Sequence, residues 1–273
     1  SKRYKPAKGR IDYTRFLDAK ALKGKRIGVV RSFFGGDPEI DALAEAALRK
    51  MRELGATTVD IQLDPDFIDA YLGNGNRKIR KISDYRFKAD WEAYLASLGP
   101  DVPKTVDDFI HLYDTEVAKS PLPVEASVMK LLKDSTTTST DDPAYKELID
   151  KTLPKATADK LALFAKYKVD VLVFPYFSAF AAPISNPVYK IDDPTYVKSS
   201  VPEPATLAGY SSVGFPCLVV PMGFGVQGLP MDIAFFGKPY EEGKILAMGY
   251  AYEQASKMRK PSPLVPPLPS EAR

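Results

Sequence analysis

Cysteine and histidine are nearly absent from this chain, which has one residue of each type among 273. The single cysteine, Cys217, excludes an internal disulfide and any cysteine-rich zinc site. The single histidine, His111, excludes a metal site built on several imidazoles, and a Ser-His-Asp triad would have to use that one residue. The sequence therefore excludes most of the common hydrolase active sites, and we expect neither a metal ion nor a cofactor.

Long apolar runs and an excess of one charge are also missing. The 38 Lys and Arg residues nearly balance the 35 Asp and Glu residues, so the formal charge of +3 gives no reason to expect nucleic acid. No stretch approaches the roughly 18 consecutive apolar residues of a membrane helix, and the basic N-terminal residues do not begin a signal peptide. We expect a soluble protein that binds neither nucleic acid nor membrane, in a compartment that the sequence leaves unknown.

The patterns that are present alternate between strand and helix. Residues 26–31 are a short apolar run typical of a buried strand, Asp37 can cap a helix that begins at Pro38, and residues 57–63 alternate as a strand does. This order predicts a parallel βα unit. The whole pattern indicates an α/β fold, with a mixed twisted sheet covered by helices. Further strands are predicted at 169–174, 217–221 and 231–236, and a last helix at 241–257.

The middle of the chain is mostly helical and more polar. We expect its helices to pack on the faces of the sheet, and Pro154 predicts a kink or a split in the last of them. The Ser/Thr tract at 135–140 is expected to be an exposed loop. The helices are predicted near 84–98, 105–118 and 142–167.

The domain organisation predicted from these patterns is simple. We find no internal repeat, and we expect a single α/β region over residues 1–260. Five prolines between 261 and 269 predict that residues 261–273 form an extended tail, because proline cannot continue a helix.

A glycine motif follows the strand at 217–221. Gly223-Phe-Gly225-Val-Gln-Gly228 matches the G-x-G-x-x-G pattern of dinucleotide sites, but that fingerprint needs a helix that starts within the glycines. Here Leu229 and Pro230 follow, and then another strand. The turn of a β-hairpin is therefore the favoured interpretation, with a dinucleotide site as a remote second.

Two serines and the cysteine are the residues that could act as nucleophiles. Ser211 and Ser212 have no Lys or His close in sequence, although a tertiary contact could supply one, so loop or cap hydroxyls are the favoured interpretation. Cys217 opens an apolar strand and is interpreted as a small buried hydrophobic residue. A catalytic thiolate with His111 as its base is the less favoured alternative.

Aromatic residues follow the strand at 169–174, where the carboxyl end of a strand in an α/β sheet usually offers a ligand crevice. Tyr176, Phe177 and Phe180 lie there, at the start of a proline-rich segment that extends to residue 204, and a loop of that length is usually functional. Ordinary core packing of these aromatic residues is an equally good interpretation.

The sequence resembles the C-terminal portion of amidase signature enzymes over nearly its whole length. The segment from Pro204 to Glu242 carries the family's series of short motifs, and the segments at 12–30 and 167–175 are similar to those of the peptide amidase-like branch. The motifs are Gly214-Phe-Pro216, Pro221-Met-Gly223, Gly228-Leu-Pro230, Gly237-Lys-Pro239-Tyr240 and, on the last helix, Ala251-Tyr252-Glu253.

This resemblance implies hydrolysis of a carboxamide C–N bond through a Ser-cisSer-Lys acyl-enzyme mechanism. The Gly/Ser-rich signature that carries those serines does not occur here, and Ser211-Ser212 falls where the family has another loop. The resemblance thus implies no catalytic residue in this chain and a partner, an N-terminal amidase portion that is missing or a separate chain. A start at Ser1 rather than Met fits that inference.

The resemblance also implies a substrate pocket to which this chain contributes. The residues expected to contact a small amide or peptide amide are Tyr176, Phe177, Ser178 and Phe180. Two alternatives stay open: a binding module derived from an amidase that carries out no chemistry, and an independent hydrolase that uses Ser211, Ser212 or Cys217. A half without its partner should expose apolar surface and could form a homo-oligomer.

Overall fold

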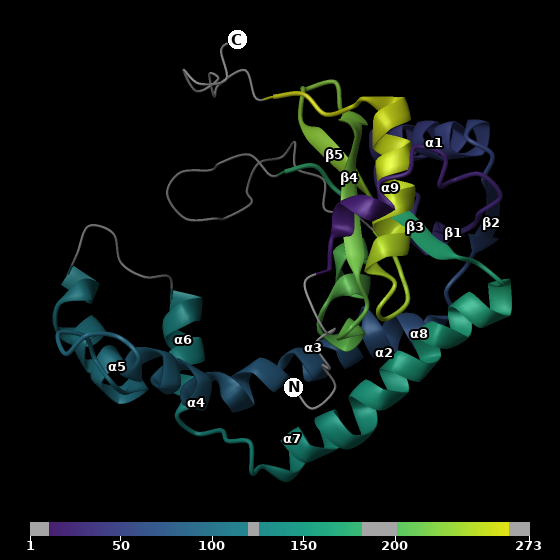
Figure 1. Cartoon of the computed structure of the whole chain (residues 1–273). Coiled ribbons are helices and arrows are strands. Elements are labelled where there is room, and N and C mark those ends of the chain that lie inside the picture. Colours follow the sequence, from purple (N-terminus) through teal and green to yellow (C-terminus); the bar gives the residue numbers. More distant parts are fainter. Residues whose placement is uncertain (1–10, 120–125, 182–200, 262–273) are drawn as a thin grey trace. The chain divides into compact units, whose positions relative to one another are not determined.

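The computed structural model describes residues 11–119, 126–181 and 201–261 (Figure 1). The described residues divide into two compact units, the first within residues 1–68 and 160–273 and the second within residues 69–159. The sequence led us to expect one α/β region over residues 1–260, and within it residues 69–159 form a compact unit of their own. Most of the expected tail, residues 262–273, lies outside the described residues.

The first unit is built on a five-stranded mixed sheet, as the sequence predicts (Figure 1). The strand order is β2-β1-β3-β5-β4. β1 pairs in parallel with β2 and β3, while β5 pairs antiparallel with β3 and β4. The bounds are β1 Arg26–Val30, β2 Thr57–Ile61, β3 Val171–Pro175, β4 Cys217–Phe224 and β5 Pro230–Phe236.

Helix α1, Pro38–Glu53, begins where the sequence predicts. The Asp37 carboxylate accepts a hydrogen bond from the Glu39 backbone N–H at 2.8 Å, and Pro38 occupies the first helical position. The apolar stripe of α1 and helix α9, Glu242–Ser256, cover one face of the sheet in a single core. This core contains alternate residues of β1, β3, β4 and β5, and the side chains between them point to the opposite face. Its sheet residues include Val171, Val173, Val220, Met222, Met231, Ile233 and Phe235.

Aromatic rings fill part of the opposite face. Phe236, the last residue of β5, is fully buried there. Its ring stacks on that of Phe215 at a centroid distance of 5.3 Å and also meets Phe174 of β3. Phe164 reaches it from helix α8, Leu153–Tyr167, at 6.4 Å. The carboxyl-terminal part of α8 therefore packs on this face.

The second unit is helical. We expected the middle helices to pack on the sheet, and the carboxyl-terminal part of α8 does so. The helices α4, α5 and α6 pack on one another around Trp91. Their apolar residues meet one another, so they form a small core within the unit. The bounds are α3 Asn74–Arg80, α4 Ile82–Ala96, α5 Val106–Thr115, α6 Ala126–Ser135 and α7 Pro143–Glu147, while α2, Pro65–Tyr71, runs across the division between the units.

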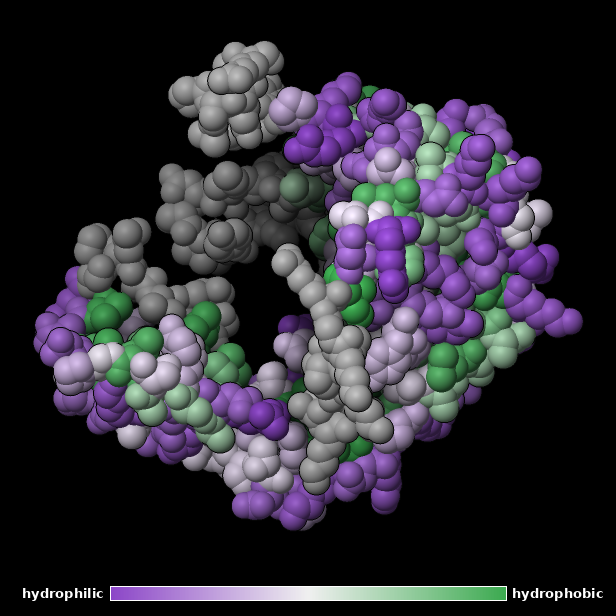
Figure 2. Space-filling view, viewed as in Figure 1, coloured by the Kyte–Doolittle hydropathy of each residue, from purple (hydrophilic) through white to green (hydrophobic). Residues whose placement is uncertain are grey.

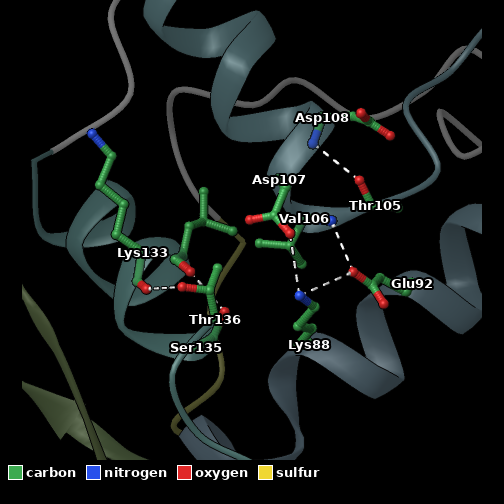
Figure 3. Close-up of polar contacts among 10 residues, drawn as sticks. Lys88, Glu92, Thr105, Val106, Asp107, Asp108, Lys133, Ser135 and Thr136 are labelled. Carbon is green, nitrogen blue, oxygen red and sulfur yellow. Dashed lines mark hydrogen bonds and ion pairs between the residues drawn. The ribbon is translucent and has the colours of Figure 1, made fainter.

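Polar contacts fix the corner between α4 and α5 (Figure 3). The Thr105 hydroxyl caps α5 by accepting the Asp108 backbone N–H at 3.0 Å. The Glu92 carboxylate of α4 accepts the Val106 backbone N–H at 3.1 Å, and Lys88 reaches Asp107 at 3.2 Å. The bonds to the Val106 and Asp108 N–H groups satisfy donors at the start of α5 that have no partner within the helix.

The sequence predicted a kink or a split at Pro154. The structure has a π-helical turn, Leu148–Thr152, between α7 and α8, and Pro154 is the second residue of α8. The regular α-helical pattern is therefore interrupted directly before the proline, while the chain remains helical. The prediction of an exposed loop at 135–140 was wrong for Ser135. This residue ends α6 and is fully buried, with its hydroxyl bonded to the Leu132 carbonyl at 2.7 Å.

Large apolar side chains also reach the surface of both units (Figure 2). In the first unit Val219 of the edge strand β4 is 41% exposed, and in the second Val128 of α6 is 44% exposed. No helix among the described residues is long and apolar enough to cross a membrane.

Candidate functional site

The residues predicted to contact substrate follow β3 directly. The Tyr176 backbone N–H donates to the Asp232 carbonyl at 3.0 Å, which extends the pairing of β3 with β5 by one residue. Its half-buried ring meets the Phe177 ring edge to face at 4.9 Å, and Phe177 is 45% exposed. Tyr176 and Phe177 are thus the predicted residues whose aromatic rings are at least partly exposed.

The side chains of Ser178 and Phe180 point into the protein rather than to the surface. Ser178 is 4% exposed, and its hydroxyl donates to the Glu203 carboxylate at 3.1 Å. Phe180 packs against the core beneath α1 and α9 and against Gly225. A Cβ atom on Gly225 would lie 2.6 Å from the end of the Phe180 ring. Only glycine at 225 leaves room for this contact. All four residues stay predictions as substrate contacts, and the structure brings Glu203 to them as a residue that the sequence did not indicate.

Tyr176 lies in an environment that disfavours its phenolate. Burial raises the pKa of Tyr176, and the nearby Cys217 and Glu203 raise it further. The hydroxyl of Tyr176 therefore stays protonated near neutral pH and can donate a hydrogen bond to a carbonyl oxygen.

Cys217 differs from its interpretation as a buried residue. It lies on β4, the edge strand of the sheet, and is exposed as a whole. The protein around the sulfur nevertheless raises the pKa of the thiol to about 11, by desolvation. A protonated thiol is a poor nucleophile, so this raised pKa does not favour a catalytic Cys217.

Alkylation of Cys217 tests this assignment, since the chain has no other cysteine. A pKa of about 11 rather than an ordinary value predicts that iodoacetamide reacts at pH 7.5 about a hundredfold more slowly than with the unfolded chain. Because the thiolate reacts, the rate should rise about tenfold per pH unit up to that pKa. Intact mass measured over time follows the reaction, with the chain in urea as the control. Rapid labelling with an inflection below pH 7 would contradict the prediction.

The glycine motif forms a β-hairpin turn, as predicted. The Gly225 N–H donates to the Leu229 carbonyl and the Gly228 N–H to the Gly225 carbonyl, both at 2.9 Å, and β5 follows. The Glu39 carboxylate of α1 accepts the Val226 N–H at 2.9 Å and so ties the turn to the helix. No helix begins within the glycines, so this segment lacks the structural context of a dinucleotide site.

Ser211 and Ser212 are buried at 1% and 3% exposure, so neither is placed as an accessible nucleophile. A lysine does lie beside them. Lys160 of α8 is fully buried, and its Nζ donates to the Ser211 hydroxyl at 2.9 Å and to the Ser211 carbonyl at 3.1 Å. The sequence held a signal for this position, because Lys160 continues the helical spacing of the buried residues Ala156 and Phe164.

Two further residues have side chains that could take part in chemistry. Asp232 places a carboxylate in the otherwise apolar strand β5, and this is the signal by which the sequence indicates the position. His111 lies on α5 in the second unit with an exposed side chain. Among the described residues no group of three or more His, Cys, Asp and Glu side chains is placed to hold a metal ion.

Comparisons with known proteins agree with this fold. A family model described as Amidase matches residues 2–246. A glutamyl-tRNA(Gln) amidotransferase subunit from Thermodesulfovibrio yellowstonii is 29% identical over 261 residues, which cover 93% of this chain and 49% of the relative. Its counterpart from Rippkaea orientalis is 30% identical over 92% of this chain and 49% of its own length. The chain therefore spans about half the length of the curated relatives that it matches.

Solved structures give the same result. The native peptide amidase of Stenotrophomonas maltophilia is similar with a TM-score of 0.73 and 28% identity, over 94% of this chain and 48% of that one. An amidase family protein from Bacillus anthracis, 24% identical, shares the fold with a TM-score of 0.67 over 93% of this chain and 43% of its own.

Proposed function

Because the chain belongs to the amidase family, we propose that it is part of an enzyme that hydrolyses carboxamide C–N bonds through a Ser-cisSer-Lys acyl-enzyme mechanism. The observation that carries this proposal is the family match over residues 2–246, together with a TM-score of 0.73 to a peptide amidase. We propose further that this chain is the C-terminal portion of that enzyme, since it lacks the Gly/Ser-rich signature and spans about half of its relatives.

The chemistry then belongs to the other portion. A serine there attacks the amide carbonyl, and a lysine moves the proton through the second serine to the leaving nitrogen. Backbone N–H groups stabilise the oxyanion, and water hydrolyses the acyl-enzyme to regenerate the serine. Ser211 of this chain is buried against Lys160 and takes no part in these steps.

Residues of this chain line part of the substrate pocket. Tyr176 and Phe177 offer aromatic surface, and the Tyr176 hydroxyl remains a hydrogen-bond donor. Ser178 and Phe180 hold the segment after β3 in place through Glu203 and Gly225. A small amide or a peptide amide fits an aromatic surface of this kind.

A second candidate function is a binding module that carries out no chemistry. It is favoured by the absence of the signature and by the burial of both hydroxyl groups at Ser211 and Ser212. A module of this kind would bind an amide or a partner protein without cleaving it, and would not need the other amidase portion.

The test combines this chain with an amidase portion that carries the serine signature. The chain alone should release no ammonia from peptide amides and should not react with a fluorophosphonate, whereas the combination should do both. Labelling of the chain alone that disappears in the Ser212→Ala variant would instead identify an independent hydrolase. If the added portion neither binds the chain nor restores turnover, the proposal of a C-terminal portion is abandoned in favour of the binding module.

A further inference from the structure

A carboxylate without a partner among the described residues lies on the face of the sheet opposite α1 and α9. Its strand neighbours Met231 and Ile233 belong to the core beneath those helices, so the alternation of side chains directs Asp232 to the other face. Asp232 is half-buried, and no hydrogen bond or ion pair joins its carboxylate to any residue that the structure describes. Burial alone raises the pKa of Asp232.

The surface around this carboxylate is apolar and aromatic. Pro221 lies opposite it on β4, and Val219, one pair further along the same face, is 41% exposed. Tyr176 lies beside it on the β3 side, where its N–H donates to the Asp232 carbonyl. A partly dehydrated carboxylate thus lies beside Tyr176, one of the residues that we assign to the pocket.

We propose that Asp232 selects amide substrates that carry a cationic group, an ammonium or a guanidinium. The inference rests on the proposed function, because it places this face in the substrate pocket. A carboxylate that has lost part of its hydration gains more from a cation than one in bulk water, and such charge-assisted hydrogen bonds are the strong ones. The aromatic side chain of Tyr176, the residue after β3, adds attraction for a cation.

The nearby acidic residue Glu203 serves as a contrast. Its carboxylate already accepts the Ser178 hydroxyl, so part of its hydrogen-bonding capacity is used inside the protein. The carboxylate of Asp232 has no such use among the residues that the structure describes, which is why we assign the selectivity to this residue.

The test uses the intact enzyme, in which this chain is joined to or combined with the portion that carries the catalytic serines. N-acetyl-argininamide and N-acetyl-citrullinamide have nearly the same shape, but only the first carries a charge. In Asp232→Asn the ratio of their kcat/KM values should fall about tenfold or more, as loss of a charged hydrogen bond predicts. The exposed Asp64 provides the matched control, and Asp64→Asn should leave the ratio unchanged.

An unchanged ratio in Asp232→Asn overturns the inference. Weaker association of this variant with the catalytic portion, at an unchanged ratio, would also overturn it and assign the carboxylate to pairing within the enzyme. Asp232→Ser repeats the test if the first variant does not fold.

If the intact wild-type enzyme cleaves neither amide, the proposed function fails. The inference about Asp232 is then tested without turnover, by the binding of agmatine, which carries cationic groups. Calorimetry on this chain should then show binding that Asp232→Asn weakens about tenfold. Equal binding by the two chains, or none by the wild type, overturns the assignment of Asp232.

Discussion

Replacing Phe236 by alanine is expected to lower the free energy of unfolding of the sheet unit by about 3–5 kcal/mol, as for other buried Phe to Ala changes. Phe236 is fully buried, and its ring meets those of Phe215, Phe174 and Phe164. These neighbours come from three separate segments, so the cavity cannot close by moving one side chain. Denaturant unfolding followed by circular dichroism measures the change.

The control for this variant is Phe177→Ala. The Phe177 ring is 45% exposed at the end of β3, so its removal should change stability by less than about 0.5 kcal/mol. Comparable losses from the two variants would contradict the assignment of Phe236 as the centre of this aromatic core. Phe236→Leu, which fills most of the volume, should lose less than half as much as the alanine variant.

The second large effect is expected at Lys160. In Lys160→Ala the sheet unit should lose about 2–5 kcal/mol, because a buried side chain is truncated and two acceptors on Ser211 lose their donor. The ammonium of Lys160 also lies 5.8 Å from the centre of the Phe67 ring. The loss is measured by denaturant unfolding.

Lys160→Met separates truncation from loss of the polar group, since methionine keeps most of the volume but removes the charge and the hydrogen bonds to Ser211. Loss of the hydrogen bonds is expected to lower the free energy of unfolding by about 1–3 kcal/mol. Removing a buried ammonium group is expected to raise it, because the cost of burying the charge is no longer incurred. Lys155 is the matched control: it lies on the same helix with a side chain that is 71% exposed, so Lys155→Ala should change stability by less than about 1 kcal/mol. A Lys160→Met variant more stable than wild type would show that burial of the charge outweighs its bonds to Ser211.

Much of the fold could be predicted because its signals are local. Asp37 and Pro38 mark the start of α1 within two adjacent residues. Likewise, the residues after Gly228 distinguish a hairpin from a dinucleotide site without knowledge of the rest of the chain. The family could be identified for the same reason, since its motifs are short and occur in order.

The candidate site could be predicted only in part. Its position after β3 follows from the general place of ligand crevices in α/β sheets. The sequence could not show that Ser178 turns inward to Glu203, which lies 25 residues further along the chain, or that Phe180 packs on Gly225. Such pairings depend on how distant segments meet.

The sequence by itself determined the scarcity of His and Cys, the mixed sheet with its helices, and the amidase family. Only the tertiary structure brought Lys160 to Ser211 across 51 residues and set the Asp232 carboxylate on the face opposite α1 and α9. Only the tertiary structure also divided the chain into two compact units. The physical reason is that propensity, capping and periodicity act within a few turns of chain, whereas burial of a charge depends on which surfaces pack together.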